Sequence, residues 1–449
     1  MSAPPLVVYP DISSFPPSYS EATRQHASLG GALTFVDFLP YCTNPGGFAS
    51  LPTFEPFRVL VQRANQWLQE NCTWEVKTCE SVEFKASQSV NIERMTYLEY
   101  GEHHTCYMRG LRLWLVPRMD QSRPAQQLDY CNLIPQQTAP AGTFGLPTFE
   151  TLQDLLQRYN SQRVYQPAPG RVLVVETQEM KIPSFSNFDP DRSFWTEHGA
   201  RSRQFLFVVR VFYELGSAGP EEIGVADFVP VQQSAGGAFT MPTYEPFSYV
   251  VARAAQWCSQ QSSLRFCNAQ SLEIKLRSDP AQGLSFGTMS NRTVVDTQRM
   301  SYTEHANVGT FYVRVLRVAY SRELAPLEGG LPPSPPLALH CKTFMPLPLT
   351  KGVLMPEFES LSATKKRVEA WIRATGARVL SCETAAMRLF SGGEAYAGTE
   401  TSFTYNNGEH NEFWIFVLRI YMDGAYQEPP EEMLPPVPEV HDTGCCVIL

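Results

Sequence analysis

The sequence predicts an α+β protein made of four tandem, divergent repeats, each with the order strand–helix–strand–strand. Three observations support this fold class: a recurring five-residue string, a tryptophan at a fixed distance after it, and a closing strand that carries an arginine. Copies of the string begin at Leu51, Leu146, Met241 and Met355. Markers that recur in the same order at similar spacing indicate repeated structural units.

The string is followed by a predicted amphipathic helix. Apolar residues from Phe57 to Leu68 fall on one helical face, and the third copy repeats the pattern. A tryptophan lies fifteen residues after the proline of the string in three copies, and we interpret it as a core residue: Trp67, Trp257 and Trp371. The Pro-Thr pair of the string predicts the helix start, with Thr53 as its cap.

Strands flank each predicted helix. A short apolar segment precedes the string, and segments that alternate polar and apolar residues follow the helix, as half-buried strands do. The closing strands carry the repeat arginines Arg112, Arg210, Arg317 and Arg419. Three copies have an aromatic residue fifteen positions earlier: Tyr97, Trp195 and Tyr302. The pattern leaves open whether the arginines face solvent or bind an anionic ligand.

The repeats divide the chain into seven segments. These are a flexible N-terminal arm at 1–30, repeat 1 at 31–118, repeat 2 at 127–215, repeat 3 at 222–322, a proline-rich linker at 323–339, repeat 4 at 340–423 and a flexible, proline-rich tail at 424–449. One helix on one small sheet leaves an apolar face uncovered, so the repeats are expected to pack in pairs. This element order resembles the duplicated small-molecule-binding barrels of the SOUL haem-binding and GyrI-like families, which implies a cavity between paired repeats.

Composition excludes several classes of protein. The formal net charge is -9, and no basic block is present, so nucleic-acid binding is not expected. The N-terminus has no secretory signal pattern, and no stretch is apolar and long enough for a spanning helix. Eleven scattered cysteines without a CxxC pair fit reduced thiols in the cytoplasm.

The last four residues, Cys446-Val447-Ile448-Leu449, match a CaaX prenylation box. The final leucine predicts a geranylgeranyl group on Cys446. A single lipid chain binds reversibly, so a second signal is expected, and Cys445 is a candidate for palmitoylation. The tail is expected to act as a semi-extended spacer. These features predict a lipid-anchored protein on the cytoplasmic face of the plasma or endosomal membrane.

The N-terminal arm carries short interaction motifs. Pro16, Pro17 and Tyr19 form a PPxY motif, which resembles the ligands of WW domains. Such WW domains occur in HECT-type ubiquitin ligases, so a ligase of this type is the implied partner. Tyr9 and Ile12 fit a tyrosine-based sorting motif, and they are close to the motif bound by ESCRT-associated proteins. Together these motifs favour a role in membrane trafficking.

No enzyme motif is apparent. The chain has no phosphate-binding loop, no dinucleotide fingerprint, no HExxH and no GxSxG. Four Glu-His pairs precede the closing strands at unequal offsets, which favours turn residues over metal ligands. The sequence thus predicts a non-enzymatic adaptor without metal or cofactor. The alternative is a binding protein for a small molecule or lipid, with its cavity between paired repeats.

Overall fold

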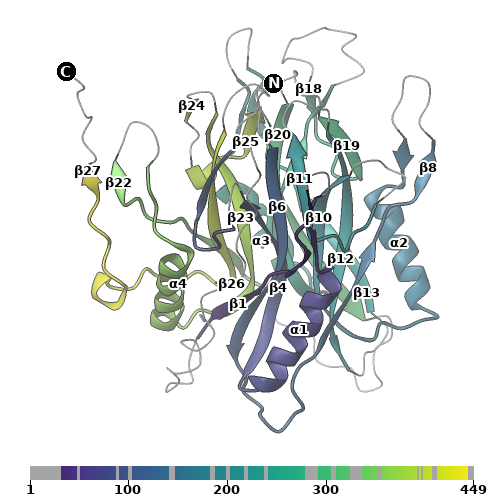
Figure 1. Cartoon of the computed structure of the whole chain (residues 1–449), viewed down its shortest axis with the longest axis horizontal. Coiled ribbons are helices and arrows are strands. Elements are labelled where there is room, and N and C mark those ends of the chain that lie inside the picture. The colour runs from purple at the N-terminus through teal and green to yellow at the C-terminus, as the bar shows by residue number, and fades with distance from the viewer. Residues whose placement is uncertain are drawn as a thin grey trace.

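In the computed structural model, residues 32–442 are described apart from a set of short segments. The segments that are not described are 1–31, 48–50, 87–89, 100–103, 141–146, 183–187, 199–202, 217–220, 237–240, 279–291, 305–309, 324–335, 352–355, 392–393, 396–397, 407–411 and 443–449. The described chain is mostly β-strand and forms four small antiparallel sheets with one helix each (Figure 1). The four predicted strand–helix repeats are therefore confirmed at this level.

Each unit contains a first strand, a helix, a long inner strand, a short strand and a long central strand. Unit 1 consists of β1 (Thr34–Phe38), β2 (Cys42–Asn44), β3 (Thr53–Phe54), α1 (Phe57–Glu70), β4 (Trp74–Ala86), β5 (Thr96–Glu99) and β6 (His104–Pro117). Unit 2 consists of β7 (Leu128–Leu133), β8 (Gln137–Ala139), β9 (Thr148–Phe149), α2 (Leu152–Arg163), β10 (Gly170–Ile182), β11 (Phe194–His198) and β12 (Arg203–Leu215).

The other two units follow the same order with small additions. Unit 3 consists of β13 (Glu221–Phe228), β14 (Gln232–Ser234), β15 (Thr243–Tyr244), α3 (Phe247–Ser259), β16 (Arg265–Lys275), β17 (Arg277–Ser278), β18 (Arg292–Val294), β19 (Ser301–Glu304) and β20 (Thr310–Glu323). Unit 4 consists of β21 (Leu339–Phe344), β22 (Thr350–Lys351), α4 (Leu361–Thr375), β23 (Val379–Ser391), β24 (Glu394–Ala395), a 3₁₀ turn (Gly398–Glu400), β25 (Phe403–Asn406) and β26 (Glu412–Asp423).

The helices begin three residues later than the position predicted with the residue after the proline as the cap. Thr53 lies in β3 and pairs with Asn44 of β2, so its backbone belongs to a hairpin and not to a helix. The first N–H of α1, at Phe57, donates instead to the carbonyl of Asp191 in unit 2, at 2.8 Å. Only α2 and α4 have side-chain caps, at Thr151 and Ser360. None of the described helices has the length and apolar character needed to cross a membrane.

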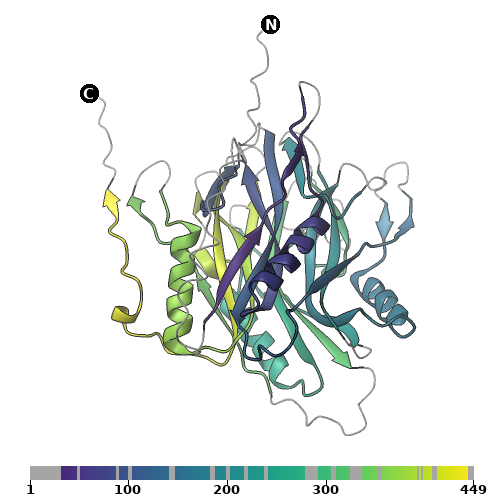
Figure 2. The same cartoon turned by 60° about the horizontal axis from the view of Figure 1, so that its bottom comes forward.

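The four sheets stand around a common axis like the blades of a propeller (Figure 2). The inner strands β4, β10, β16 and β23 lie next to the axis, and each contacts the next one around the ring. The expected packing in pairs is therefore wrong, because every sheet has two faces to cover and meets a neighbour on both sides. The ring closes where β23 of unit 4 meets β4 of unit 1.

Each helix is wedged between its own sheet and the next sheet of the ring. Around α1, Leu111 and Leu113 of unit 1 share a buried cluster with Leu173 and Phe212 of unit 2. Around α4, the same arrangement brings Leu33 and other residues of unit 1 against unit 4. Burial of apolar side chains at these four wedges supplies the main stabilisation of the ring.

Neighbouring units also exchange their short strands. The short strands β11, β19 and β25 pair with the central strands β6, β12 and β20 of the units before them. The short strand β5 of unit 1 pairs with β26 of unit 4, so the exchange runs around the whole ring. Because every unit needs a strand from its neighbour, no sheet is complete without the closed ring.

A belt of hydrogen bonds joins the inner strands at one level, and we call it the latch belt. Glu176 of unit 2 accepts from the N–H and the hydroxyl of Ser81 in unit 1, each at 2.8 Å. Equivalent pairs link Glu383 to Ser271 and Glu80 to Thr384, at 2.7–2.8 Å. In unit 3, Gln270 takes the place of the glutamate and bonds the backbone of Thr177.

The four repeat arginines support the latch belt. They are at most 3 % exposed, so they do not face solvent. Three of them donate to latch hydroxyls at 2.7–2.9 Å: Arg112 to Thr384, Arg210 to Ser81 and Arg317 to Thr177. Arg419 lies 3.4 Å from the latch carboxylate of Glu383. The sequence left open whether these arginines contact solvent or bind a ligand. The structure gives them a structural role instead.

The charge of each arginine is balanced in a different way from unit to unit. Arg317 has Asp227 on the first strand and a neutral Gln270 in the latch belt. Arg210 has the neutral Asn132 on the first strand and Glu176 in the latch belt. Unit 1 has both carboxylates, Asp37 and Glu80, beside Arg112. Divergence among the repeats thus preserves at least one carboxylate for each buried arginine.

The C-terminal tail is docked on the ring as far as Asp442, after a second 3₁₀ turn (Glu431–Met433). The ring of Tyr426 packs edge-on against Trp371 of α4, and the indole N–H of Trp371 donates to Glu428 at 3.0 Å. Strand β27 (His441–Asp442) pairs in parallel with β22. The prediction of a flexible spacer is therefore wrong for residues 424–442, because these contacts fix the segment to unit 4.

The unequal charge balance predicts different responses to the same substitution. Glu80→Gln keeps one of the two oxygens that accept from Thr384 and Trp114 and leaves Arg112 with Asp37, so we expect the free energy of unfolding to fall by about 1 kcal/mol. Glu176→Gln leaves Arg210 buried without its carboxylate, so we expect a loss of about 3 kcal/mol. Chemical denaturation at pH 8 measures both values, and equal losses would contradict the charge compensation.

Candidate functional site

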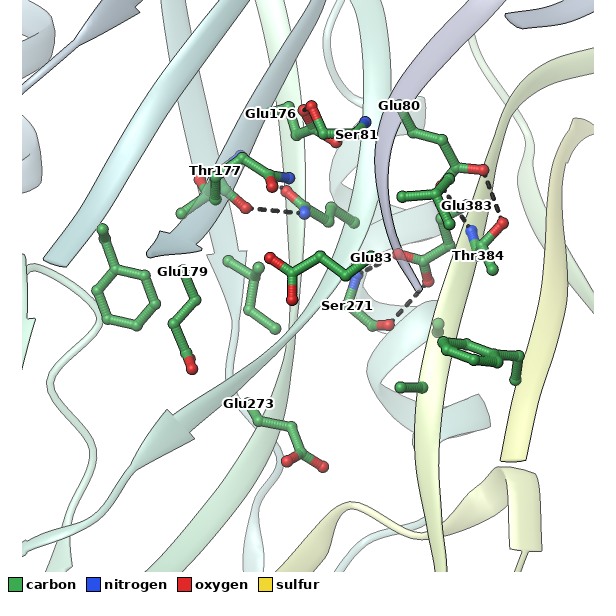
Figure 3. Close-up of a pocket in the computed structure, with 18 of the residues that line it drawn as sticks. Glu80, Ser81, Glu83, Glu176, Thr177, Glu179, Ser271, Glu273, Glu383 and Thr384 are labelled. Carbon is green, nitrogen blue, oxygen red and sulfur yellow. Dashed lines mark hydrogen bonds between the residues drawn. The ribbon is translucent and has the colours of Figure 1, made fainter. Parts of the chain in front are cut away.

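The ring encloses a cavity of about 350 Å³ on its axis. Its walls come from all four inner strands, and the labelled side chains of these strands face one central space (Figure 3). The latch belt lies at one level of this space, and aromatic residues of the central and exchanged strands line another part. The volume falls within the range of pockets that hold small ligands.

Acidic side chains outnumber basic ones on the cavity wall. Among the described lining residues, the acidic ones are Glu80, Glu83, Glu176, Glu179, Glu273, Glu304 and Glu383. The basic ones are Lys181, Arg314 and Arg388. Three of the glutamates belong to the latch belt and have a repeat arginine beside them, so they are part of the scaffold.

The next level of the inner strands lies three residues after the latch belt, and its ion pairs differ from unit to unit. Glu83 pairs in register with Arg109, and Glu273 with Arg314, and both pairs form salt bridges, at 2.5 and 2.9 Å. The equivalent position of unit 4 is Ala386, opposite Phe416, so both charges are absent there.

Unit 2 keeps the glutamate of this level without the arginine. Glu179 lies opposite Phe207, in the position that Arg109 and Arg314 occupy in units 1 and 3. Figure 3 shows Glu83, Glu179 and Glu273 pointing into the cavity from three different inner strands. Of the three glutamates at this level, Glu179 is therefore the one that has no arginine opposite it.

The surroundings of Glu179 favour its protonated form. Its pKa is raised to about 8, first by desolvation inside the ring and then by repulsion from the carboxylates of Glu304, Glu83 and Glu273. The hydroxyl of Tyr302 donates a hydrogen bond that opposes this shift. The side chain is exposed to the space of the cavity although the ring surrounds it. A carboxyl group in this position can change its protonation state near neutral pH.

The latch carboxylates are also perturbed. Burial raises the pKa of Glu176 to about 7, although the charge of Arg210 and the hydrogen bonds from Ser81 oppose the shift. Burial likewise raises the pKa of Glu80, against the charge of Arg112. These groups are held by several hydrogen bonds each, which assigns them to the scaffold.

Stacked aromatic pairs form part of the wall at the seams between units. Tyr107 of unit 1 stacks on Trp195 of unit 2, with ring centroids 5.5 Å apart and planes 8° from parallel. Tyr97 of unit 1 stacks on Trp414 of unit 4 in the same way, at 5.9 Å and 7°. A guanidinium lies over each indole as well, at 4.7 Å for Arg109 over Trp195.

The indole N–H groups of these two tryptophans have no acceptor among the described residues. Trp195 is only 9 % exposed, and both indole rings line the cavity. A buried N–H without a partner is unfavourable unless another group satisfies it. Both nitrogen atoms are themselves buried in the wall, so they are unsatisfied donors and not groups that the open cavity presents to a ligand.

The site residues predicted from the sequence belong to the two tails and fall outside the described residues: Tyr9, Ile12, Pro16, Pro17, Tyr19, Cys445 and Cys446. The aromatic residues fifteen positions before the repeat arginine do line the cavity: Tyr97, Trp195 and Tyr302. The tryptophans of the helices lie outside it, with Trp371 buried and Trp67 and Trp257 packed half-buried against the core.

Sequence reasoning missed the cavity glutamates. The position three residues before the repeat arginine alternates between Arg109, Phe207, Arg314 and Phe416. This alternation was visible in the sequence, but its meaning depends on which glutamate lies opposite each residue. Among the described residues, no three His, Cys, Asp or Glu side chains converge on a point that could hold a metal ion.

The fold and the cavity define a class of protein: a closed ring of four sheet-and-helix units around an axial, carboxylate-rich cavity. No protein-family model, no curated protein and no solved structure matches the chain significantly. The resemblance to the duplicated barrels was one of element order, and the ring arrangement differs from a pair of repeats.

The raised pKa of Glu179 predicts how stability depends on pH. The folded state holds a proton on this group up to about pH 8, whereas the unfolded chain loses it near pH 4.3. The resulting stabilisation is complete below the unfolded pKa and is lost as the pH rises through the folded pKa. We expect the melting temperature to fall between pH 5 and pH 9, and to fall less in Glu179→Gln. Parallel melting curves for the two proteins would contradict this assignment.

Proposed function

We propose that the protein is a non-enzymatic, lipid-anchored adaptor on the cytoplasmic face of the plasma or endosomal membrane. A prenyl group on Cys446 would attach the ring to the bilayer, and the PPxY motif at Pro16, Pro17 and Tyr19 would recruit a WW-domain protein such as a HECT-type ubiquitin ligase. Tyr9 and Ile12 would link the complex to membrane trafficking.

The docked position of the C-terminal tail supports a close attachment of the ring to the membrane. Cys446 follows Asp442 by only four residues, and Asp442 is fixed to the ring through β27. Four extended residues span at most about 14 Å, so a lipid on Cys446 would hold the ring close to the bilayer. Strands β22 and β27 lie at the same end of the ring as β8, β18 and β24 (Figure 1). This end would face the membrane.

A single prenyl chain needs a second contact for stable binding. Palmitoylation of Cys445 would provide one. The docked tail offers another, because its apolar side chains Met433, Val437 and Val440 are exposed, Val437 to 75 %. They lie within the last segment before the anchor and could enter the interfacial layer of the bilayer. The acidic residues of the tail make attraction to anionic lipids an unsuitable second contact.

Removal of the prenylated cysteine tests the anchor. We expect Cys446→Ser to move the full-length protein from the membrane fraction to the soluble fraction, because no CaaX thiol remains. Cys445→Ser should cause partial release. The exposed Cys72 on the ring provides a matched control, and Cys72→Ser should leave the distribution unchanged. Quantitative fractionation measures all three variants, and membrane retention of Cys446→Ser would disprove the anchor.

Substitution of the PPxY tyrosine tests the recruitment. Tyr19→Ala should abolish capture of the full-length protein by WW domains of a HECT-type ligase, because the tyrosine fills a separate pocket of the domain. Tyr9→Ala changes another tyrosine of the same arm and should leave capture intact. A pulldown with purified WW domains measures both, with thermal melting as the control for folding. Equal capture of the two variants would refute the motif assignment.

A second candidate function is the binding of a small molecule. The axial cavity favours it, since Glu179 lines this space opposite Phe207, without the arginine that lies opposite Glu83 and Glu273. This function is compatible with an adaptor, because the cavity and the tails occupy different parts of the chain.

A further inference from the structure

We propose that the axial cavity binds a small, uncharged molecule whose amide N–H and C=O lie side by side, as in a lactam or a cyclic urea. The carboxamide of Gln178 would hold this edge, accepting from the N–H and donating to the C=O. This proposal rests on the second candidate function and is independent of the lipid anchor and of the WW partner.

Gln178 replaces an apolar residue of the repeat. It lies on β10, two residues after the latch residue Glu176. The equivalent residues of the other three units are all apolar: Val82, Leu272 and Ala385. The residue opposite Gln178 in the sheet is Val208, which is fully buried and has no polar side-chain atom. The repeat scaffold therefore does not need a carboxamide at this position.

The carboxamide of Gln178 is buried without a partner. The residue is 7 % exposed and lines the axial cavity. Within the described part of the chain, no residue forms a hydrogen bond with this carboxamide. Its oxygen and nitrogen are accessible from the cavity, whereas the indole nitrogens of Trp195 and Trp414 are sealed in the wall. A buried amide without a partner is unfavourable, so a ligand in the cavity would satisfy it.

The seam between units 1 and 2 places Gln178 at the level of an ion pair. Side chains two residues apart on a strand share one face, so Gln178 lies on the same face as Glu176, which bonds Ser81 across this seam. On the facing strand of unit 1, Glu83 follows Ser81 by two residues and lines the same cavity. The carboxylate of Glu83 is bound by Arg109. The charge at this level of the seam is therefore balanced within the protein.

The acids of the cavity have partners of their own, so they do not require a cationic ligand. Two glutamates at the level above the latch belt are bound by arginines. The hydroxyl of Tyr312 donates to Glu304, and that of Tyr302 donates to Glu179, whose pKa of about 8 keeps it protonated at neutral pH. The remaining carboxylates around the same space would repel an anion. An uncharged ligand fits this wall best.

Three matched six-membered rings test the two hydrogen bonds. The probe δ-valerolactam has both the donor and the acceptor, cyclohexanone has the acceptor alone, and piperidine is a cation at neutral pH. For molecules of this size we expect a dissociation constant of about 1–10 mM for the lactam. Cyclohexanone and piperidine should each bind about fivefold more weakly. Saturation-transfer NMR with the full-length protein measures the affinities.

The repeat itself supplies the matched variant. Gln178→Leu introduces the residue type of Leu272, its equivalent in unit 3. This variant should weaken the lactam about tenfold or more, since both hydrogen bonds are lost, and it should remove the preference for the lactam over cyclohexanone. Gln62→Leu, at an exposed position of α1, is the control and should bind like the wild type.

Two further measurements separate binding from a structural role. Gln178→Leu removes an unpaired buried amide, so its melting temperature should equal or exceed that of the wild type. In the wild type, the isotope-labelled side-chain amide resonance of Gln178 should shift on titration with the lactam. This second readout does not depend on the folding of any variant.

Several results would overturn the proposal. It fails if the lactam does not bind the wild type up to about 50 mM, or binds without moving the resonance of Gln178, because the amide is then hydrated by water only. It also fails if cyclohexanone or piperidine binds as well as the lactam, or if Gln178→Leu binds the lactam like the wild type. In these cases the cavity still takes small molecules, so the second candidate function survives. A lower melting temperature of Gln178→Leu would assign the side chain to the scaffold.

Discussion

The latch belt determines how the four units meet. Each inner strand carries a carboxylate or amide that binds the backbone of the preceding unit, and the three carboxylates also accept from its hydroxyl. Three of the repeat arginines donate to a hydroxyl of the belt. These groups are buried, so each must find its partner, and only a closed ring supplies all of them. The belt therefore sets the spacing of the inner strands, and this spacing leaves a cavity on the axis.

Each of the four buried arginines needs a carboxylate nearby, and the repeats supply this carboxylate from different positions. The carboxylate that balances the arginine lies on the first strand in unit 3, in the latch belt in unit 2 and in both places in unit 1. Repeats that look divergent thus keep at least one carboxylate for each buried arginine. The same comparison makes Glu179 stand out, because it breaks the pattern at the next level of the cavity.

Two parts of the molecule have separate roles in the functions that we propose. The tails contain the motifs for lipid attachment and partner binding, and the ring provides the surface that the docked tail holds near the bilayer. Docking of residues 424–442 changes the expected geometry from a long tether to a short one, since Trp371 and β22 fix the segment. The ring and the membrane would then move as one assembly.

The sequence by itself determined the four repeats, the amphipathic helix faces and the short motifs of the tails, because these depend on local periodicity and on a few adjacent residues. It could not determine the ring, the strand exchange or the role of Arg112 and its equivalents, since these depend on contacts between distant segments such as Glu80 and Thr384. The cavity could not be predicted from the sequence for the same reason, because all four units line it. Only the register between β10 and β12 shows that Glu179 faces a phenylalanine where its counterparts face arginine.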